Sequence, residues 1–292
     1  MQLLKIIKYI VNHPLGRRNK FFSVIRFIFW QLRGLITSKP YVYQFTPKSK
    51  LSISKGMKGA TGNIYTGLHE FGEMGFLLHL LRPEDTFVDV GANVGTYTIL
   101  ASAQVGAKSF CFEPSPSTFL SLEENIKLNK IESKVIAKQM GISKEKSSLF
   151  FTNNLDVENH IEIEKSSESI EVDVDTLDNL IKNEFPVLIK IDVEGFETDV
   201  LNGAKDTLSN LELKAIIIEL IGLGEKYGFD ETKVRNILTE TGFCPYEYNP
   251  IERRLTKINS IATNNTIYIR DINFVAKRIK EASTIKILNS DF

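Results

Sequence analysis

The 292-residue sequence contains only two cysteines, Cys111 and Cys244, too few for a disulfide framework and without metal-binding spacing. It has no uninterrupted apolar stretch approaching the roughly 20 residues that a bilayer-spanning helix needs. No cleavage site of small residues follows the first apolar run, so we expect no signal peptide. Aromatic and aliphatic residues make up much of the chain, with 42% hydrophobic content. These features predict a folded protein of a reducing, cytoplasmic compartment.

Acidic residues are absent from the first 69 positions, which carry twelve lysines and arginines. The remaining 223 residues have a net charge of −12, although the whole chain is neutral. Such asymmetry favours a basic face that meets an anionic partner. Residues 1–38 are predicted to form a basic amphipathic arm of two short helices, broken at residues 13–16. This arm either lies on the inner face of an anionic membrane as a peripheral contact, or packs its apolar stripe on the protein or on a second subunit.

Missing motifs exclude several classes of function. The sequence has neither the G-x-S-x-G elbow of serine hydrolases nor a G-x-x-x-x-G-K-[ST] phosphate loop. Its four histidines show no metal-ligand spacing, so no residue is assigned to a metal. Nucleic acid is not expected as a partner, because the body is acidic and the aromatic residues of the arm follow helical spacing. The oligomeric state is left open.

Beyond the arm, the sequence divides into a flanking segment and a core. Residues 39–82 predict strands at 41–45 and 50–53, a glycine-rich loop at 56–67 and a helix at 69–81. Residues 83–292 alternate strands with helices, which is typical of a parallel sheet. Strands are predicted near 86–90, 108–113, 134–140, 186–192 and 214–220, with more within 242–270. Helices are predicted near 95–104, 115–129, 175–182, 196–208, 230–241 and 273–281, and a mobile loop over 153–169.

The most informative segment is residues 86–98, where a buried strand leads through a glycine turn into a helix. In open α/β sheets, ligands bind at the carboxyl ends of strands, beside such a helix start. The spacing is D-x-G-x-x-x-G rather than the dinucleotide pattern G-x-G-x-x-G, because Asn93 and Thr96 stand where glycines are needed. Asp89, two residues before Gly91, would repel a pyrophosphate but suits a ligand that carries an ammonium and a sulfonium. The segment therefore favours S-adenosylmethionine (SAM) over NAD.

Further polar residues are predicted at the same edge of the sheet. Glu113 ends the second strand 24 residues after Asp89, about where an acid binds ribose hydroxyls in nucleotide-binding folds. The alternative for Glu113 is a helix-capping or solvated carboxylate. The amides that open the helix at Gly95 offer a positive end for the methionyl carboxylate. Asn93 either contacts the ligand or is only a turn residue with a positive φ angle.

A second charged segment, residues 188–197, is predicted to face the acceptor. Lys190, Asp192 and Glu194 alternate along a strand end and therefore share one side until a glycine breaks the pleat. Either Asp192 or Glu194 binds or deprotonates the acceptor, or Lys190 forms a structural ion pair with Asp192 or Glu219. Methyl transfer is an in-line displacement, so alignment supplies much of the rate. A base near an acceptor hydroxyl contributes about 10²–10⁴-fold more.

Two histidines are further candidates for that base. His69 lies just upstream of the first core strand, and His160 lies in the predicted loop. The ordinary pKa of histidine suits acid–base catalysis near neutral pH. A surface or capping role is the alternative for each. His13 and His79 lie in apolar helical settings and are expected to be structural.

Three segments, residues 87–98, 112–114 and 189–197, together resemble the FkbM family of SAM-dependent methyltransferases, and the resemblance extends over about 60–272. It implies an α/β fold of the class I methyltransferase (Rossmann-like) type. Such a fold has a mostly parallel seven-stranded sheet, helices on both faces and an antiparallel last strand. The resemblance assigns the methionine portion of the cofactor to Asp89, Gly91, Asn93 and Gly95 and its ribose to Glu113. Tyr97 is a further cofactor-binding candidate. Family members methylate hydroxyl groups, including those of sugars in exported glycans and of polyketides.

We therefore expect a SAM-dependent O-methyltransferase that acts on a sugar, a glycan or a similar polyhydroxylated acceptor, either a small molecule or lipid-linked. One alternative is a nicotinamide-dependent oxidoreductase on a Rossmann-like fold, against which Asn93 and Thr96 argue. The other is a catalytically silent, membrane-associated SAM-binding protein, against which Asp192 and Glu194 argue. The basic arm suits a lipid-linked saccharide at a membrane face. The identity of the acceptor and the position methylated are not predicted.

Overall fold

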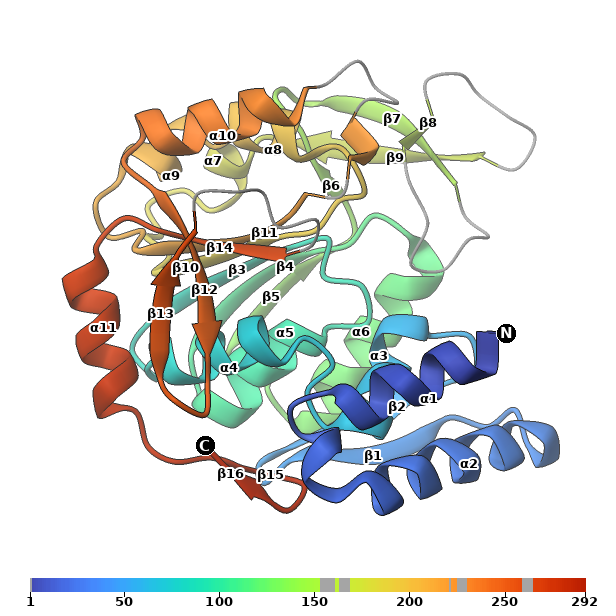
Figure 1. Ribbon diagram of the computed structural model, residues 1–292. Coiled ribbons are helices and arrows are strands. Elements are labelled where there is room, and N and C mark those ends of the chain that lie inside the picture. Colours follow the sequence, from blue (N-terminus) through green and yellow to red (C-terminus); the bar gives the residue numbers. More distant parts are fainter. Residues whose placement is uncertain (1, 153–160, 163–168, 221, 225–229, 259–264) are drawn as a thin grey trace.

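A central eight-stranded sheet carries the fold (Figure 1), with the order β13-β12-β14-β11-β10-β3-β4-β5. The computed structural model describes all residues except 1, 153–160, 163–168, 221, 225–229 and 259–264. The parallel strands are β3 (Thr86–Val90), β4 (Lys108–Phe112), β5 (Val135–Lys138), β10 (Leu188–Ile191) and β11 (Ala215–Glu219). The others are β12 (Cys244–Asn249), β13 (Arg254–Lys257) and β14 (Asn265–Ile269). Strand β14 runs antiparallel between β11 and β12.

The predicted fold class is confirmed, with one addition. Seven strands form the expected mostly parallel sheet, and the last of them, β14, is the antiparallel one. Strand β13 extends the edge as an eighth strand by pairing with β12 in a hairpin. Strands β3, β4, β10 and β11 are almost entirely buried, which explains their continuous apolar sequences. The charged side chains Asp89 and Lys190 are exceptions within these strands, and they occupy paired positions of β3 and β10.

Helices cover both faces of the sheet and enclose a separate apolar core on each. One face carries α4 (Phe71–Leu80), α5 (Thr96–Ile99), α6 (Pro116–Asn129) and α11 (Ile272–Glu281). The other carries α7 (Leu177–Leu180), α8 (Glu197–Asn202), α9 (Lys205–Ser209) and α10 (Glu231–Glu240). Most predicted helices are present, but α5 continues as a π-helix, η2 (Leu100–Val105). The predicted helix at 196–208 is divided near Gly203 into α8 and α9.

The predicted glycine-rich loop at 56–67 is wrong, because its larger part forms helix α3 (Lys58–Thr66). The structure gives a packing reason for a glycine within this helix. A Cβ atom on Gly62 would lie 2.4 Å from Nδ1 of His69, so only glycine lets the imidazole approach the helix this closely. Before α3, strands β1 (Tyr41–Thr46) and β2 (Ser49–Ile53) form the predicted hairpin.

A smaller sheet lies beyond the carboxyl end of β5, with the order β6-β9-β7-β8. Its strands are β6 (Gly141–Ile142), β7 (Ser147–Thr152), β8 (Ile161–Glu162) and β9 (Ser169–Asp175). The loop predicted over 153–169 is therefore wrong at β8 and at Ser169, which pair with β7. The rest of that prediction, including His160, lies outside the described residues. A last small hairpin joins β15 (Lys286–Ile287) and β16 (Ser290–Asp291).

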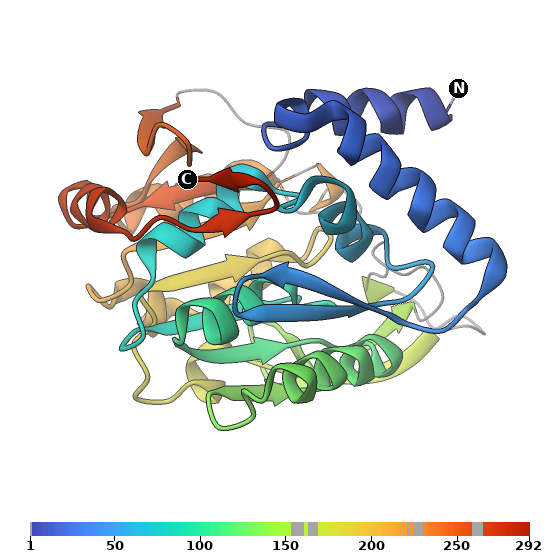
Figure 2. The same cartoon turned by 90° about the horizontal axis from the view of Figure 1, so that it is seen from below.

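The N-terminal residues form α1 (Gln2–Asn12), the 3-10 turn η1 (Gly16–Asn19) and α2 (Lys20–Ile36) along one side of the molecule (Figure 2). Ile10, Phe27 and Trp30 are buried, and Arg26 donates a 2.9 Å hydrogen bond to the carbonyl oxygen of Tyr65. This arm is therefore attached through both apolar and polar contacts. Across the described part of the chain, no helix is both long and apolar enough to cross a membrane. The predicted domain boundaries after residues 38 and 82 stay predictions.

Candidate active site

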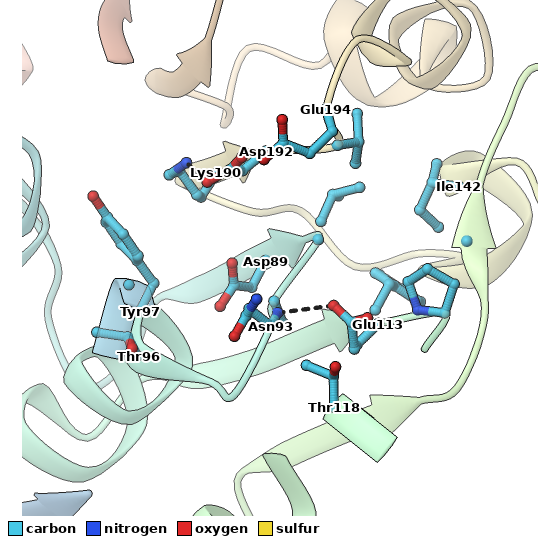
Figure 3. Close-up of a pocket in the computed structure, with 18 of the residues that line it drawn as sticks. Asp89, Asn93, Thr96, Tyr97, Glu113, Thr118, Ile142, Lys190, Asp192 and Glu194 are labelled. Atoms are coloured by element: carbon cyan, nitrogen blue, oxygen red, sulfur yellow. Dashed lines mark hydrogen bonds and ion pairs between the residues drawn. The ribbon is translucent and has the colours of Figure 1, made fainter. Parts of the chain in front are cut away.

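A pocket opens at the carboxyl ends of β3, β4 and β10 (Figure 3). Figure 3 shows Lys190, Asp192 and Glu194 along one side of it and Asp89, Asn93 and Glu113 along the other. The predicted site residues that line it are Asp89, Gly91, Asn93, Tyr97, Glu113, Asp192, Glu194 and His69. Gly95 lies at the start of α5 without lining the pocket, and His160 falls outside the described residues. The functional roles of these residues stay predictions, but their proximity is observed.

Asp89 is buried at the end of β3 and binds the start of the next helix. Its Oδ2 accepts hydrogen bonds from the Thr98 amide at 3.0 Å and the Thr98 hydroxyl at 2.7 Å. Burial raises the pKa of Asp89 to about 6, and the hydrogen bonds from Thr98 oppose part of that rise. The carboxylate therefore holds α5 against the strand end as well as contributing negative charge to the pocket.

Glu113 points into the pocket from the end of β4 and is held by two backbone amides. Its Oε2 accepts a 2.9 Å hydrogen bond from the Asn93 amide, and its Oε1 accepts one of 2.9 Å from the Ser115 amide. Burial raises the pKa of Glu113 to about 7. Asn93 has a positive φ of 50° and its own side chain accepts from the Val94 amide at 2.8 Å, so it is a turn residue that also orients Glu113.

The two glycines of the motif are required by protein packing. Gly91 has a φ of +78°, and a Cβ atom there would lie 1.9 Å from the carbonyl oxygen of Asp192. Gly95 has a φ of +88°, and its Cβ would lie 2.5 Å from Cδ1 of Leu122. Gly91 thus lets β3 and the segment after β10 meet closely, which brings the two charged sides of the pocket together.

Lys190 and Asp192 form an ion pair at the edge of this pocket. The Lys190 side chain is only 2% exposed, and its Nζ lies 2.9 Å from Oδ2 of Asp192, whose side chain is 32% exposed. Burial acts to raise the pKa of Asp192, but the Lys190 ammonium outweighs it and holds that pKa below its ordinary range. The ion pair proposed as an alternative from the sequence is therefore present, and Asp192 remains accessible from the pocket.

Glu219, at the end of β11, holds a proton beside this pair. Burial and the negative charge of Asp192 raise the pKa of Glu219 to about 9, so at neutral pH it donates a hydrogen bond to Asp192. Asp192, Glu194 and Glu219 place carboxylate oxygens within 4.8 Å of one another, an arrangement that can also hold a cation. The buried Lys190 ammonium already supplies positive charge there.

His69 and Glu70 form another wall, of which the sequence analysis singled out only the histidine. Burial lowers the pKa of His69, so its ring is neutral at neutral pH. Glu70 accepts hydrogen bonds from the Tyr97 hydroxyl at 2.5 Å and from Nδ2 of Asn265 at 2.7 Å. Tyr97 is thus fixed by Glu70, and burial raises its pKa. Glu70 was not predicted as a site residue, although the segment 68–70 is part of the family resemblance and Glu70 lies beside His69.

The chain is similar to known methyltransferases. Residues 89–245 match the model of the methyltransferase FkbM domain. The hexuronic acid methyltransferase AglP of Haloferax volcanii is 27% identical over 186 residues, which are 63% of this chain and 70% of AglP. Methyltransferase 1 of Beauveria bassiana is 30% identical over 167 residues, or 47% of this chain and 66% of that protein.

The chain is also similar to solved structures of other proteins. The crystal structure of methyltransferase FkbM from Methylobacillus flagellatus is 17% identical, with a TM-score of 0.47. The match covers 75% of this chain but only 56% of that one, so this chain spans about half the length of that structure. A putative methyltransferase from Streptococcus mutans, solved in complex with S-adenosylhomocysteine (SAH), is 15% identical, with a TM-score of 0.43 and coverage of 68% and 96% of the two chains.

The pocket residues fit SAM, the cofactor of this family. Glu113 offers two carboxylate oxygens to ribose hydroxyls, and Asp89 and Asp192 add negative charge that suits a sulfonium and an ammonium. The D-x-G-x-x-x-G spacing provides the tight turn between them. The nicotinamide alternative is therefore set aside. Residues 89–245, more than half of the chain, match the family model, and the chain therefore belongs to the FkbM family of SAM-dependent methyltransferases.

Proposed function

We propose that this enzyme methylates a hydroxyl group of a sugar, a glycan or a similar polyhydroxylated acceptor. The observation that carries the proposal is an ionised Asp192, 32% exposed, in the same pocket as the carboxylates suited to SAM. Such a group can take a proton from a hydroxyl placed beside it. The name of the relative AglP, a hexuronic acid methyltransferase, supports a sugar as the acceptor class.

In the proposed reaction, bound SAM supplies an electrophilic methyl group on a sulfonium. Asp192 accepts the proton of the acceptor hydroxyl, which becomes strongly acidic as its oxygen bonds to carbon. Even a carboxylate of low pKa is basic enough for this step, and a base at this place contributes about 10²–10⁴-fold. Lys190 keeps Asp192 ionised, and the protonated Glu219 donates a hydrogen bond to Asp192 rather than competing for the proton of the acceptor.

Incubation with isotope-labelled SAM tests the proposal directly. The full chain is incubated with labelled SAM and with glycolipid and soluble glycoside fractions, and products are identified by mass spectrometry and NMR. Label in an O-methyl group of a sugar supports the proposal. Label found only in N-methyl, C-methyl or S-methyl products, or only in acceptors that are not polyhydroxylated, contradicts it. Absence of any labelled product from the sugar fractions, while SAM binds, contradicts it as well.

We also propose that the enzyme works at the cytoplasmic surface of an anionic membrane, where lipid-linked saccharides are within reach. Helix α2 exposes an apolar stripe at helical spacing, namely Phe21 (70%), Ile25 (41%), Ile28 (48%), Leu32 (55%) and Leu35 (80%). Leu3 and Leu4 of α1 are exposed as well. The first 69 residues carry twelve cations and no acid. An apolar stripe on a basic segment is the pattern of helices that lie in an anionic interface.

Vesicle flotation tests this surface. The wild type is expected to float with phosphatidylglycerol-containing vesicles, less with pure phosphatidylcholine, and less at high salt. A variant with Phe21→Glu and Leu35→Glu should lose most of the binding. Leu211→Glu is a matched control, because Leu211 is 72% exposed and lies outside the arm. Equal recovery with both lipids, recovery with neither, or a stable dimer that the two arm substitutions dissociate would overturn the proposal.

A further inference from the structure

A second groove adjoins the SAM pocket at the same edge of the sheet. Its walls come from segments far apart in the sequence: the arm, the start of α4, the end of β12 and the first residue of β14. His69 and Glu70 line both the groove and the pocket, so they form the boundary between the two. An acceptor bound in this groove would therefore lie next to the methyl donor.

The arm contributes a cation to this groove. Arg17, in η1, is exposed, and its guanidinium has no hydrogen bond or ion pair among the contacts found for the described residues. A guanidinium presents a planar fork of donors that matches a carboxylate. On the floor, burial raises the pKa of Glu73 to about 7 and that of Glu219 to about 9. At pH 7 Glu219 is therefore mostly neutral and Glu73 about half neutral, which reduces the negative charge opposite Arg17.

Two lining residues have polar atoms without partners. Nε2 of His13 and Oδ1 of Asn265 are buried and have no hydrogen-bond partner among the residues that the structure describes. His13 is 6% exposed, and burial lowers its pKa to about 4, so the ring is neutral. Unpaired buried polar atoms are costly and uncommon in folded proteins. Both residues line the groove, His13 from the arm and Asn265 from β14, so its walls are polar on two sides.

Tyr9, also from the arm, fixes the histidine at the boundary. Its hydroxyl donates to the carbonyl oxygen of His69 at 2.9 Å and lies 2.6 Å from Nδ1 of the same residue. The hydroxyl has a single proton, so Nδ1–H is the donor in the second contact. This tautomer leaves Nε2 of His69 as a hydrogen-bond acceptor. Tyr9 is therefore a positioning residue for an imidazole that can accept a hydrogen bond from a sugar hydroxyl.

We propose that this groove is the acceptor site and that it takes an acidic sugar. In this arrangement Arg17 binds the carboxylate of the sugar, while His69, Glu73 and Asn265 bind its hydroxyls. The arm is thus part of the active site. The proposal rests on the proposed sugar O-methylation and adds to it the charge of the acceptor and the residues that select it.

The test compares two glycosides that differ only in a carboxylate. Binding of p-nitrophenyl β-D-glucuronide and p-nitrophenyl β-D-glucoside to the full chain is measured by calorimetry with SAH present. The wild type should bind the glucuronide more tightly. Arg17→Ala should weaken glucuronide binding about tenfold and leave the glucoside unchanged, because one charge-assisted contact is lost. Arg18→Ala, an exposed neighbour that does not line the groove, should change neither.

Tyr9→Phe provides a second, independent readout. This substitution should weaken the binding of both glycosides equally, because the two share the hydroxyls that His69 binds. It should leave the affinity for SAH unchanged. Equal glucuronide affinity of Arg17→Ala and Arg18→Ala, no preference of the wild type for the glucuronide, or no binding of either glycoside overturns the groove proposal. Methyl transfer to a sugar that is insensitive to Arg17 overturns it too, while the proposed function stands. Methyl transfer only to acceptors that are not polyhydroxylated is the separate failure of the proposed function.

Discussion

Nζ of Lys190 lies 2.9 Å from Oδ2 of Asp192, and this buried cation controls the charge of Asp192 at the edge of the pocket. The lysine is on β10, paired with β3 on one side and β11 on the other. Burial acts to lower its pKa, but Asp192, Glu70 and Glu219 raise it above its ordinary value, so it stays charged. A lysine so deeply buried is tolerated only because carboxylates surround it.

Replacing the lysine by an apolar residue of similar length should affect both stability and pH dependence. Lys190→Met leaves buried carboxylates without their cation and should lower the free energy of unfolding by about 3 kcal/mol. It also removes the charge that depresses the pKa of Asp192, so the acid limb of the pH–rate profile should move to higher pH. Urea unfolding and the pH dependence of methyl transfer check this. Lys182→Met, at an exposed position, is the control, and an unmoved acid limb would contradict the prediction.

Asp192→Asn should lower kcat by about 10²–10⁴-fold, because the amide cannot accept the proton of the hydroxyl. The affinity for SAH should fall much less, because Glu113 and the turn between Gly91 and Gly95 are unchanged. Steady-state kinetics and calorimetry measure the two effects. Asp173→Asn, an exposed carboxylate on β9, serves as a control. A kcat close to that of the wild type would show that the proton goes elsewhere, with His69 and Glu194 as the next candidates.

The affinity for SAH should depend on pH through Glu113. Burial raises the pKa of this carboxyl to about 7, above its ordinary value, so it is largely protonated at about pH 6 and ionised at about pH 8. An ionised carboxylate is the stronger acceptor for ribose hydroxyls, so SAH should bind several-fold more tightly at the higher pH. Calorimetry at both values checks the trend. Glu113→Gln should weaken SAH binding and make the affinity for SAH less dependent on pH. If the pH dependence is unchanged in this variant, another group is responsible for it.

The positions of the site segments could be predicted because local sequence encodes them. Strands β3, β4 and β10 are short, mostly apolar runs that are followed directly by a glycine or a carboxylate, and parallel strands bring those ends together. Asp89, Glu113 and Asp192 therefore lie in one pocket as expected. Helix α3 was not predicted, because glycine has low helix propensity and the reason for Gly62 is the ring of His69, which tertiary packing places there.

The Lys190–Asp192 ion pair could be predicted, because the two residues lie two positions apart at one strand end, but partners that tertiary packing brings together could not. Glu70 and Asn265 are 195 positions apart in the chain, yet Nδ2 of Asn265 is 2.7 Å from Oε1 of Glu70. The contact of Tyr9 with His69 likewise joins the arm to the segment before α4. The sequence indicated that the arm is amphipathic, but the wall that it contributes to the second groove depends on how α1 and η1 pack, which no local pattern encodes.

Metal removal should leave the activity unchanged. Asp192, Glu194 and Glu219 can hold a cation by distance alone, but the Lys190 ammonium already balances the charge of Asp192, and Glu219 retains a proton. Methyl-transfer rates before and after treatment with EDTA, followed by addition of Mg²⁺, check this. A loss of activity that Mg²⁺ restores would assign the cluster to a metal instead. Lys190→Met offers the converse experiment, since removing the ammonium should increase the affinity of the cluster for Mg²⁺.

Gly91→Ala should disrupt the pocket far more than an alanine at a glycine of similar conformation. At φ +78°, any Cβ costs about 1–2 kcal/mol of backbone strain. At Gly91 the methyl group also meets the Asp192 carbonyl oxygen at 1.9 Å, so β3 must move away from the segment after β10. Gly222→Ala is the matched control, because φ is +83° there and no heavy atom of the residues that the structure describes lies within 4 Å of its Cβ, its chain neighbours apart. Urea unfolding and SAH calorimetry should show a larger stability loss and weaker binding for Gly91→Ala. Equal losses for the two variants would mean that β3 tolerates the displacement and that the close approach is not needed for cofactor binding.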